Sequence, residues 1–491
     1  VKDAEQHRDS ALPLIQKRAD NLHKASRNQS VQDDVASKQE TGRNHKRTLA
    51  IIKPFPDINL SNGQKLKFRS AVPVFGASES FIALIHDKSL RLFKRMQKHT
   101  LYCSTTDGKH PVPMTMRGHE HEKDLRMKYG GRSRSQDLLP TGTMIVWRCE
   151  WPAERKNESC HDVVVSEEDA EKPLATLQAC HNTDVYREKK YNMVACRSNV
   201  WTSKGKESES GVLQLPQWVE YMLMHGVDQI FFYTLSNTSW AYKAAIQPYL
   251  DSGLGQEIHL DTSVDPDHSI ATKLSILRQD GYISQQLQVN DCIYRAKYRT
   301  TWLSPSLDVD EYLRPTNIYE SSLGNYDLPK MLSDYAQGEE TIHPLAGKVC
   351  CLEFHGIIFR HPQDPFSQLQ LESHFRGKKQ EEEESMGFGA RYPKYLLRPE
   401  LVHASFIHWP TSWEEGYRSV PTQNFLYHHY RTSDESKTRR ADHTLVDQAA
   451  EVRRRIEERF SMSWPELAQQ LKVANEDDND HTLLPRLPKA V

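Results

Sequence analysis

The sequence lacks several features that would place it in a familiar class of protein. Its 64 Lys and Arg residues are balanced by 66 Asp and Glu residues, so the formal net charge of -2 provides no basic field for nucleic acid. No apolar run approaches the ~20 residues needed to span a bilayer. None of the eight cysteines forms a Cys-x-x-Cys pair, which argues against zinc ribbons and thioredoxin-like redox chemistry.

The chain also begins with Val1 instead of methionine, which leaves a preceding signal or anchor segment open. Four N-glycosylation sequons favour the secretory pathway, at Asn28, Asn59, Asn157 and Asn237. We therefore expect the Golgi lumen or another secretory compartment, with the protein held as a type II membrane protein by an anchor that this chain does not contain.

Four cysteines lie close together in the first half of the chain, within a span of ~80 residues that suits disulfides in an oxidising compartment. They are Cys103, Cys149, Cys160 and Cys180. Four cysteines allow three connectivities, and we predict Cys103 with Cys149 as one pair.

At 491 residues the chain is too long for one ordinary core, and composition divides it into four parts. Residues 1–68 are polar and predict a largely disordered stem or linker. Residues 69–190 contain short apolar runs cut by turns, which predict a small all-β sandwich whose carbohydrate binding stays open. Residues 191–431 predict an α/β domain, and residues 432–491 a helical tail that packs on it.

Strands and helices alternate from Tyr191 onward. Apolar strand patterns at 192–196, 229–233 and 257–260 are separated by helical patterns, the first of which has Pro216 for its first turn and Gly226 just past its end. This order predicts a parallel sheet with covering helices. Ligands bind beyond the carboxyl ends of such strands, where we expect Ser236 and the turn at Asp308 to gather.

Residues 307–313 read Leu-Asp-Val-Asp-Glu-Tyr-Leu. Extended backbone would put the carboxylates of Asp308 and Asp310 on one face, with Val309 directed into the core and Glu311 bracing the turn. Two such carboxylates suit a hard divalent cation that holds a diphosphate. The alternative is a solvated acidic turn, because Asp-x-Asp arises by chance on the order of once in such a chain; it also occurs at 265–267 and 478–480.

Five motifs in order carry a resemblance to a known family. They lie at 218–233, 290–295, 308–313, 394–400 and 406–431. Together they resemble glycosyltransferase family 92. The resemblance implies an inverting transferase of GT-A (Rossmann-like) fold that moves galactose from UDP-galactose in β-linkage onto another sugar. The plant galactan synthases of this family carry an N-terminal carbohydrate-binding sandwich, which the segment 69–190 resembles.

The resemblance also implies roles for individual residues. Asp310 is expected to bind Mn2+ or another divalent cation directly, and Asp308 to contact the ribose or a metal-bound water. His408 matches the family's C-terminal histidine and would complete the metal shell, unless it is only a histidine on a surface strand. We therefore expect a metal site of Asp308, Asp310 and His408.

The residues that bind the sugar donor and the residue that acts as the catalytic base are less closely defined. Asn290 and Asp291 are expected to bind the uracil or the donor sugar, with Ser236 nearby, and Arg295 is expected to contact phosphate or to pair with Asp291. Inversion needs a base on the acceptor side. Glu353 is the candidate, with Glu372 as an alternative.

One departure from the family pattern concerns the approach to Asp308, where Pro305 cannot donate to a central strand ladder. A rival interpretation is thus a glycan-binding protein with a degenerate, non-catalytic transferase domain. A third interpretation, a metal-dependent phosphodiesterase, would need more His and Asp metal ligands clustered in the sequence than are found. We expect a UDP-sugar donor and a poly- or oligosaccharide acceptor as partners, with no nucleic acid, and leave a homodimer open.

Overall fold

The computed structural model describes most of the chain from Ala50 to Glu476. The described residues are 50–52, 58–60, 65–66, 68–75, 80–86, 100–105, 111–118, 145–151, 160–167, 173–180, 191–198, 209–235, 238–260, 281–316, 326–360, 364–372, 375–376, 393–431, 440–441 and 445–476. Residues 47–491 form one compact unit. None of the described helices is long and apolar enough to cross a membrane.

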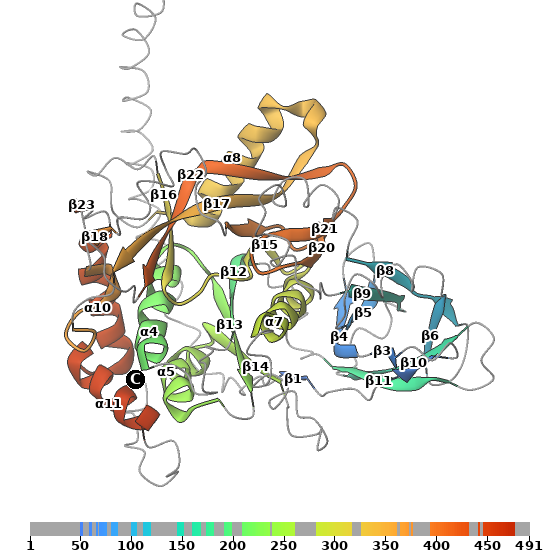
Figure 1. Cartoon of the computed structure of the whole chain (residues 1–491), viewed down its shortest axis with the longest axis horizontal. Helices are drawn as coiled ribbons and strands as arrows, with labels where there is room; N and C mark the ends of the chain where they lie inside the picture. Colours follow the sequence, from blue (N-terminus) through green and yellow to red (C-terminus); the bar gives the residue numbers. More distant parts are fainter. Residues whose placement is uncertain are drawn as a thin grey trace, which may run out of the picture. The chain divides into compact units, whose positions relative to one another are not determined.

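An 11-stranded mixed sheet dominates the described residues, in the order β1-β14-β13-β12-β15-β19-β17-β18-β23, with β22 pairing β16 and β17 off this path (Figure 1). Its strands are β1 (Ala50–Ile52), β12 (Tyr191–Arg197), β13 (Gln229–Leu235), β14 (Gly255–Leu260), β15 (Thr300–Ser304), β16 (Glu311–Pro315), β17 (Lys348–Arg360), β18 (Phe375–Arg376), β19 (Lys394–Leu397), β22 (Tyr417–Arg431) and β23 (Arg440–Ala441).

The parallel part of the sheet has a reversal of strand order at β12. This strand pairs in parallel with both β13 and β15, and β13 pairs in parallel with β14. The chain therefore builds the sheet first to one side of β12 and then to the other. A crevice opens at the carboxyl ends of the strands at such a point and is where ligands of open α/β sheets bind. The predicted α/β architecture with parallel strands is confirmed.

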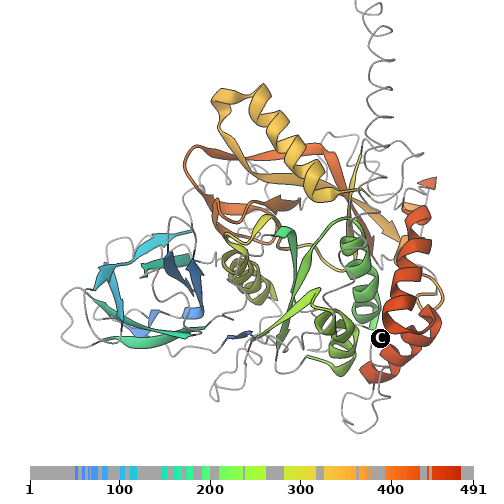
Figure 2. The ribbon, with the colours of Figure 1, turned by 180° about the vertical axis from the view of Figure 1, so that it is seen from behind.

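Six α-helices lie within the described residues: α4 (Glu209–Met224), α5 (Trp240–Asp251), α7 (Gly281–Ala296), α8 (Leu328–Ile342), α10 (Val446–Phe460) and α11 (Trp464–Glu476). Alternate residues of β12 divide between two hydrophobic clusters, with Met193 and Ala195 packed with α4 and α5, and Val194 and Cys196 packed with α7. Helices α4 and α5 thus cover one face of the sheet and α7 the other (Figure 2).

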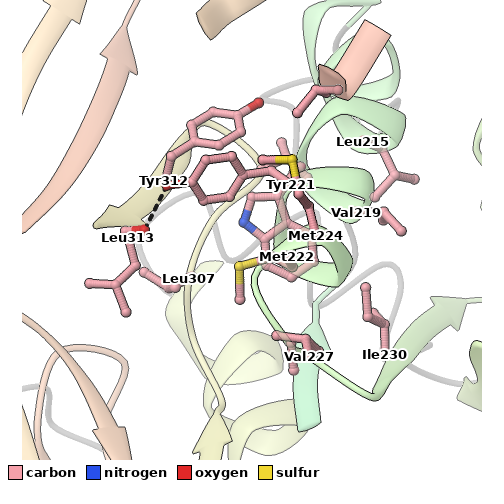
Figure 3. Packing of buried hydrophobic residues seen from close by; sticks show 14 of the residues in the cluster. Leu215, Val219, Tyr221, Met222, Met224, Val227, Ile230, Leu307, Tyr312 and Leu313 are labelled. Atoms are coloured by element: carbon pink, nitrogen blue, oxygen red, sulfur yellow. Dashed lines mark hydrogen bonds between the residues drawn. The ribbon is translucent and has the colours of Figure 1, made fainter. Parts of the chain in front are cut away.

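Helix α4 differs from the prediction at its start. It begins at Glu209, so Pro216 lies inside the helix and not in its first turn. Its end is as expected, because Gly226 has a φ of +92° just beyond the last turn, a conformation that favours glycine. The Trp218 indole donates to the Glu311 carbonyl over 3.1 Å. The Tyr221 hydroxyl donates to the Leu313 carbonyl over 2.8 Å (Figure 3). Helix α4 thereby fixes β16 and the turn before it.

The C-terminal helices pack on α4 and α5 (Figures 1 and 2). Glu220 of α4 is fully buried, and its two carboxylate oxygens accept from Arg455 at 3.0 Å and Arg459 at 2.7 Å, both on α10. Removing one partner of such a buried pair is strongly destabilising, so the pairing anchors α10.

Two four-stranded sheets are formed by strands that lie between β1 and β12 in the chain. Their orders are β4-β5-β9-β8 and β11-β10-β6-β7, with β4 (Phe68–Phe75), β5 (Ser80–His86), β6 (Leu101–Thr105), β7 (Val112–Pro113), β8 (Thr115–Arg117), β9 (Ile145–Glu150), β10 (Cys160–Glu167) and β11 (Ala175–Cys180). Both contribute side chains to one hydrophobic cluster. A disulfide joins Cys103 to Cys149 as predicted, and a second joins Cys160 to Cys180.

The expected stem is partly folded. Strand β1 pairs in parallel with β14 of the large sheet, and β2 (Ile58–Asn59) pairs with β3 (Lys65–Leu66). Ile58 and Leu60 are buried in the cluster shared by the two four-stranded sheets. The prediction of a disordered stem to residue 68 therefore fails for these residues, because a few apolar side chains without periodicity still find a core to enter.

Helix α7 connects the small sheets to the large one. Residues of β4, β5 and β9 share a hydrophobic cluster with α7 and with strands of the large sheet. The Ser70 hydroxyl of β4 donates to Asp291 of α7 over 2.5 Å, inside the protein. The segment before Tyr191 is thus packed against the α/β part and is not a separately suspended module.

Candidate functional site

The carboxylate turn at 308–311 lies between β15 and β16, beyond the carboxyl end of the parallel strands. Strand β15 ends at Ser304, directly before Pro305, so the strand is shortened and carries no bulge. The turn is closed by the Glu311 amide donating to the Asp308 carbonyl, and by the Asp308 amide donating to the Glu311 carboxylate, each over 2.9 Å. The Glu311 side chain therefore braces the turn, as expected, and Val309 is buried in the core.

Asp308 faces three donors from distant parts of the chain. Its carboxylate lies 2.9 Å from the Lys394 ammonium, 3.6 Å from the Arg197 guanidinium and 3.4 Å from the Gln285 amide of α7. Burial raises the pKa of Asp308, but the charges of Lys394 and Arg197 outweigh it and lower the pKa to about 2. The side chain is 38% exposed, so this carboxylate is a charged, fixed and accessible group.

Lys394 is the cation at the centre of the site. It is the first residue of β19, and its side chain is only 2% exposed. Its ammonium contacts Asp308, the Glu311 carboxylate at 2.8 Å and the Ser306 carbonyl at 2.7 Å. The pKa of Lys394 is raised because the two carboxylates outweigh the effect of burial. An ammonium has three N–H donors, and three oxygens use them here.

Asp310 faces the other side of the turn, toward β22. Its carboxylate lies 3.2 Å from Nε2 of His429, and its carbonyl accepts from the Tyr430 amide over 2.8 Å. Nδ1 of His429 lies 3.6 Å from Glu311. The two carboxylates of the Asp-x-Asp stretch therefore have different neighbours, because a turn and not an extended strand carries them.

His408 lies near Lys394, Asp308 and His429. Its Nδ1 lies 3.2 Å from the Pro393 carbonyl. Burial, together with the charges of Lys394 and His429, lowers the pKa of His408 to about 3, although the charge of Asp308 opposes the shift. His408 is thus within electrostatic reach of the site and is neutral near pH 7.

The predicted donor residues of α7 are engaged inside the protein. The Asn290 amide donates to the Ser405 carbonyl and accepts from the Ser405 amide, at 2.8 and 2.9 Å. Asp291 is fully buried, and its carboxylate accepts from Arg295 and Tyr233 at 2.6 Å each. Of the two roles open for Arg295, the geometry gives pairing with Asp291. We therefore leave these three residues out of the donor site.

Glu353 does not face the carboxylate turn. On neighbouring strands, Glu353 of β17 is paired with Tyr395 and Phe354 with Lys394. Directly paired residues share a face and successive residues alternate, so Glu353 lies on the face opposite Lys394. Its carboxylate accepts from the Ser419 hydroxyl at 2.6 Å. The expected role as base disagrees with this placement, and the alternative Glu372 pairs with Arg453 at 2.7 Å. Ser236 lies outside the described residues.

A divalent cation would find two adjacent ligand atoms at this site, the Asp310 carboxylate and Nε2 of His429. The Glu311 carboxylate near Nδ1 of His429 is the kind of outer partner that orients a metal-binding imidazole. Among the described residues no three His, Cys, Asp or Glu side chains are grouped to hold a metal ion. The donor set fits a cation that receives its remaining ligands from substrate phosphates and water.

Sequence reasoning missed Lys394, Arg197, Gln285 and His429 as parts of the site. Arg197 directly follows an apolar strand pattern, and strand ends were where a ligand was expected, so that signal was present. Lys394 and His429 lie within two of the motifs that carry the family resemblance, but no site role was given to them, because their relation to Asp308 and Asp310 depends on strand pairing across about a hundred residues.

Comparison with known proteins assigns the chain to a family. The model of a family described as glycosyltransferase family 92 matches residues 205–481, which is more than half of the chain. A search of curated proteins finds no match. The matched segment contains both aspartates, Lys394 and His429, and begins after Arg197.

Proposed function

The chain belongs to glycosyltransferase family 92, and we propose that it is an inverting, metal-dependent enzyme that moves galactose from UDP-galactose in β-linkage onto a glycan. Membership supports a glycosyltransferase; the donor, the linkage and the metal are the proposal. The proposed fold is of GT-A type, preceded by a β-sandwich formed by the two four-stranded sheets.

One observation carries the proposal. The accessible carboxylate turn at Asp308 and Asp310 lies where strand order reverses at β12, at the edge of the sheet where open α/β folds bind their ligands. Carboxylates at that position would suit a cation that holds the diphosphate of a nucleotide sugar, and the turn lies within the residues that the family model matches.

We assign the direct protein contacts of the cation to Asp310 and His429, whose facing atoms are 3.2 Å apart. A bound Mn2+ would neutralise the charge that collects on the departing diphosphate. Asp308 is held away from this pair by Lys394, which suits the expected contact with the ribose or a metal-bound water. His408 is neutral and close to these residues, and we assign it to the same site but not to the direct contacts of the cation.

The base that accepts the acceptor's hydroxyl proton is not assigned to a residue. Glu353 lies on the opposite face of the sheet, and Glu311 is held by Lys394 and the Asp308 amide. We propose that the acceptor, a poly- or oligosaccharide, meets the donor at the exposed side of Asp308, and that the sandwich contributes to its binding. A secretory compartment such as the Golgi lumen completes the proposal.

The test is release of UDP from UDP-galactose and transfer to an array of glycan acceptors, with manganese and with a chelator. Metal-dependent transfer with inversion supports the proposal. A glycan-binding protein with a degenerate site is the second candidate, favoured by the close engagement of Asp308 with Lys394 and Arg197. Glycan binding without donor turnover by any UDP-sugar would establish that candidate instead.

A further inference from the structure

The geometry points to Arg197 as a residue that binds a phosphate of the nucleotide donor, an inference that rests on the proposed function. Arg197 is the last residue of β12 and lies outside the segment that the family model matches. Its guanidinium lies 3.6 Å from the Asp308 carboxylate and still has hydrogen-bond donors to offer.

The position of Arg197 is the one that an open α/β sheet uses for ligands. Strand β12 has β13 on one side and β15 on the other, and the strand order reverses there. Ala195 of β12 is paired with Ser304, the last residue of β15. Arg197 follows two residues after Ala195, so Arg197 and Ser304 are on the same face of the sheet. Both lie at the mouth of the crevice between the two strand ends.

Both side chains have polar atoms without a hydrogen-bond partner. In the part of the chain that the structure describes, Nε and Nη1 of Arg197 and the hydroxyl of Ser304 are buried and donate to no acceptor. Arg197 is 2% exposed and Ser304 fully buried. Buried donors are nearly always paired in native proteins, so two orphaned groups on adjacent strand ends indicate a partner that binds from outside.

Lys394 and Arg197 differ in whether their hydrogen-bond donors are already used within the protein. The three donors of Lys394 are used by Ser306, Asp308 and Glu311. Arg197 has only the 3.6 Å ion pair with Asp308, a carboxylate already neutralised at 2.9 Å by Lys394. Structural demands on Asp308 are therefore met without Arg197.

A diphosphate matches what Arg197 offers. The guanidinium presents planar, permanently charged donors that bind two phosphate oxygens at once, which an ammonium cannot do. A buried guanidinium whose N–H donors lack acceptors destabilises the free protein, and such a group is retained where a ligand supplies the acceptors. Phosphate oxygens beyond the Asp308 carboxylate would supply the missing acceptors and bring the leaving group next to the Asp310 and His429 pair.

The experiment compares the full-length protein with Arg197→Met, Arg197→Lys and Arg299→Met by calorimetric titration of UDP, UMP, uridine and inorganic pyrophosphate. Arg299 is a matched control, since it is a buried arginine at the opposite end of the same strands, over the rings of Tyr191 and Phe231. We expect Arg197→Met to weaken UDP binding by about 10- to 100-fold and uridine binding hardly at all. Arg197→Lys should fall between, and Arg299→Met should bind UDP as the wild type does.

Thermal unfolding without ligand distinguishes a binding role from a structural one. Because Arg197→Met removes a buried guanidinium that has unused hydrogen-bond donors and a long ion pair to an already neutralised Asp308, its melting temperature should be equal to that of the wild type or higher. A lower melting temperature with unchanged UDP affinity would overturn the inference and leave the proposed function standing. If the wild type binds no UDP, the proposed function fails, and the titration with pyrophosphate then tests the inference. Pyrophosphate binding by the wild type that Arg197→Met abolishes would support a phosphate site at Arg197. If the wild type binds no pyrophosphate either, the inference is refuted.

Discussion

The ammonium of Lys394 lies 2.9 Å from Oδ2 of Asp308, although 86 residues separate them in the chain. The same ammonium lies 2.8 Å from the buried carboxylate of Glu311. One lysine thus fixes both the accessible carboxylate of the site and the residue that closes its turn. The shape of the site depends on this cation even before any ligand binds.

Replacing Lys394 should therefore damage both stability and activity. Lys394→Met leaves Glu311 as a buried charge without its cation, a loss worth ~3 to 5 kcal/mol in the free energy of unfolding. Lys394→Arg should keep most of the stability but displace Asp308, because a guanidinium cannot contact three oxygens in the same geometry. Denaturant unfolding and UDP release measure the two effects. Lys330→Met, at an exposed pair with Asp334, is the control and should change neither.

The metal assignment predicts how strongly substitutions at Asp310, His429 and His408 affect turnover and manganese binding. Asp310→Ala should reduce turnover by ~100- to 1,000-fold, because an electrostatic stabiliser of the leaving group is lost. His429→Ala should raise the manganese concentration required for half-maximal activity more than His408→Ala does, since Nε2 of His429 lies 3.2 Å from the Asp310 carboxylate. Manganese titrations monitored by activity and by direct metal binding check this order. A stronger effect of His408→Ala on metal binding would return the imidazole ligand to His408.

The stability of the protein should depend on pH through the titration of His225. Burial lowers the pKa of this histidine to about 4 from its ordinary 6.5, with Nδ1 accepting from the Tyr326 amide and Nε2 facing Gln448. Between pH 6.5 and 4 the unfolded chain therefore binds a proton that the folded protein does not, and stability falls as the pH falls. The full loss in the free energy of unfolding from this titration is about 3 kcal/mol.

The measurement is the free energy of unfolding at several pH values for the wild type and His225→Gln. The glutamine keeps a polar group beside Gln448 but cannot titrate. The variant should be less stable at pH 7, since a stacked contact with Tyr326 is lost, and its stability should decline less between pH 6.5 and 4. Parallel curves would show that other groups cause the decline.

The packing of β4 on α7 predicts that the chain cannot be cut cleanly before Tyr191. A fragment beginning near Arg187 would expose the cluster that Val72, Phe81 and Ile85 share with α7. It should be poorly soluble or unfold at a lower temperature. In the full chain, Ser70→Ala should cost ~1 to 3 kcal/mol, because the buried Asp291 loses a donor. A stable, active fragment would show that the small sheets are an independent module.

The disulfide between Cys103 and Cys149 is open to a direct chemical test. It closes a loop with a sequence separation of 46, and loss of a native disulfide in such a domain typically costs ~2 to 5 kcal/mol. Peptide mapping of protein from a eukaryotic secretory system should find this pair and the pair of Cys160 with Cys180. The exposed Asn59 is the sequon to examine for a glycan in the described residues. Free thiols at all four cysteines and no occupied sequon would refute the assignment.

The sequence by itself determined the parts of this protein that depend on local pattern. Alternating apolar runs indicated the α/β sheet, Gly226 marked the end of α4, and Val309 between two aspartates predicted a buried residue beneath a carboxylate turn. The family resemblance placed the candidate site at Asp308 and Asp310. These features depend on neighbours within one or two turns, which periodicity and backbone preference report directly.

Only the tertiary structure decided which side chains face the carboxylates. Lys394, Arg197 and Gln285 reach Asp308 from β19, β12 and α7, and His429 reaches Asp310 from β22. A change of register by one residue would have put Glu353 in place of Phe354 on the face of Lys394. Strand order and register are set by packing of the whole sheet, so no local pattern could have distinguished the buried Asn290 and Asp291 from the residues that make the site.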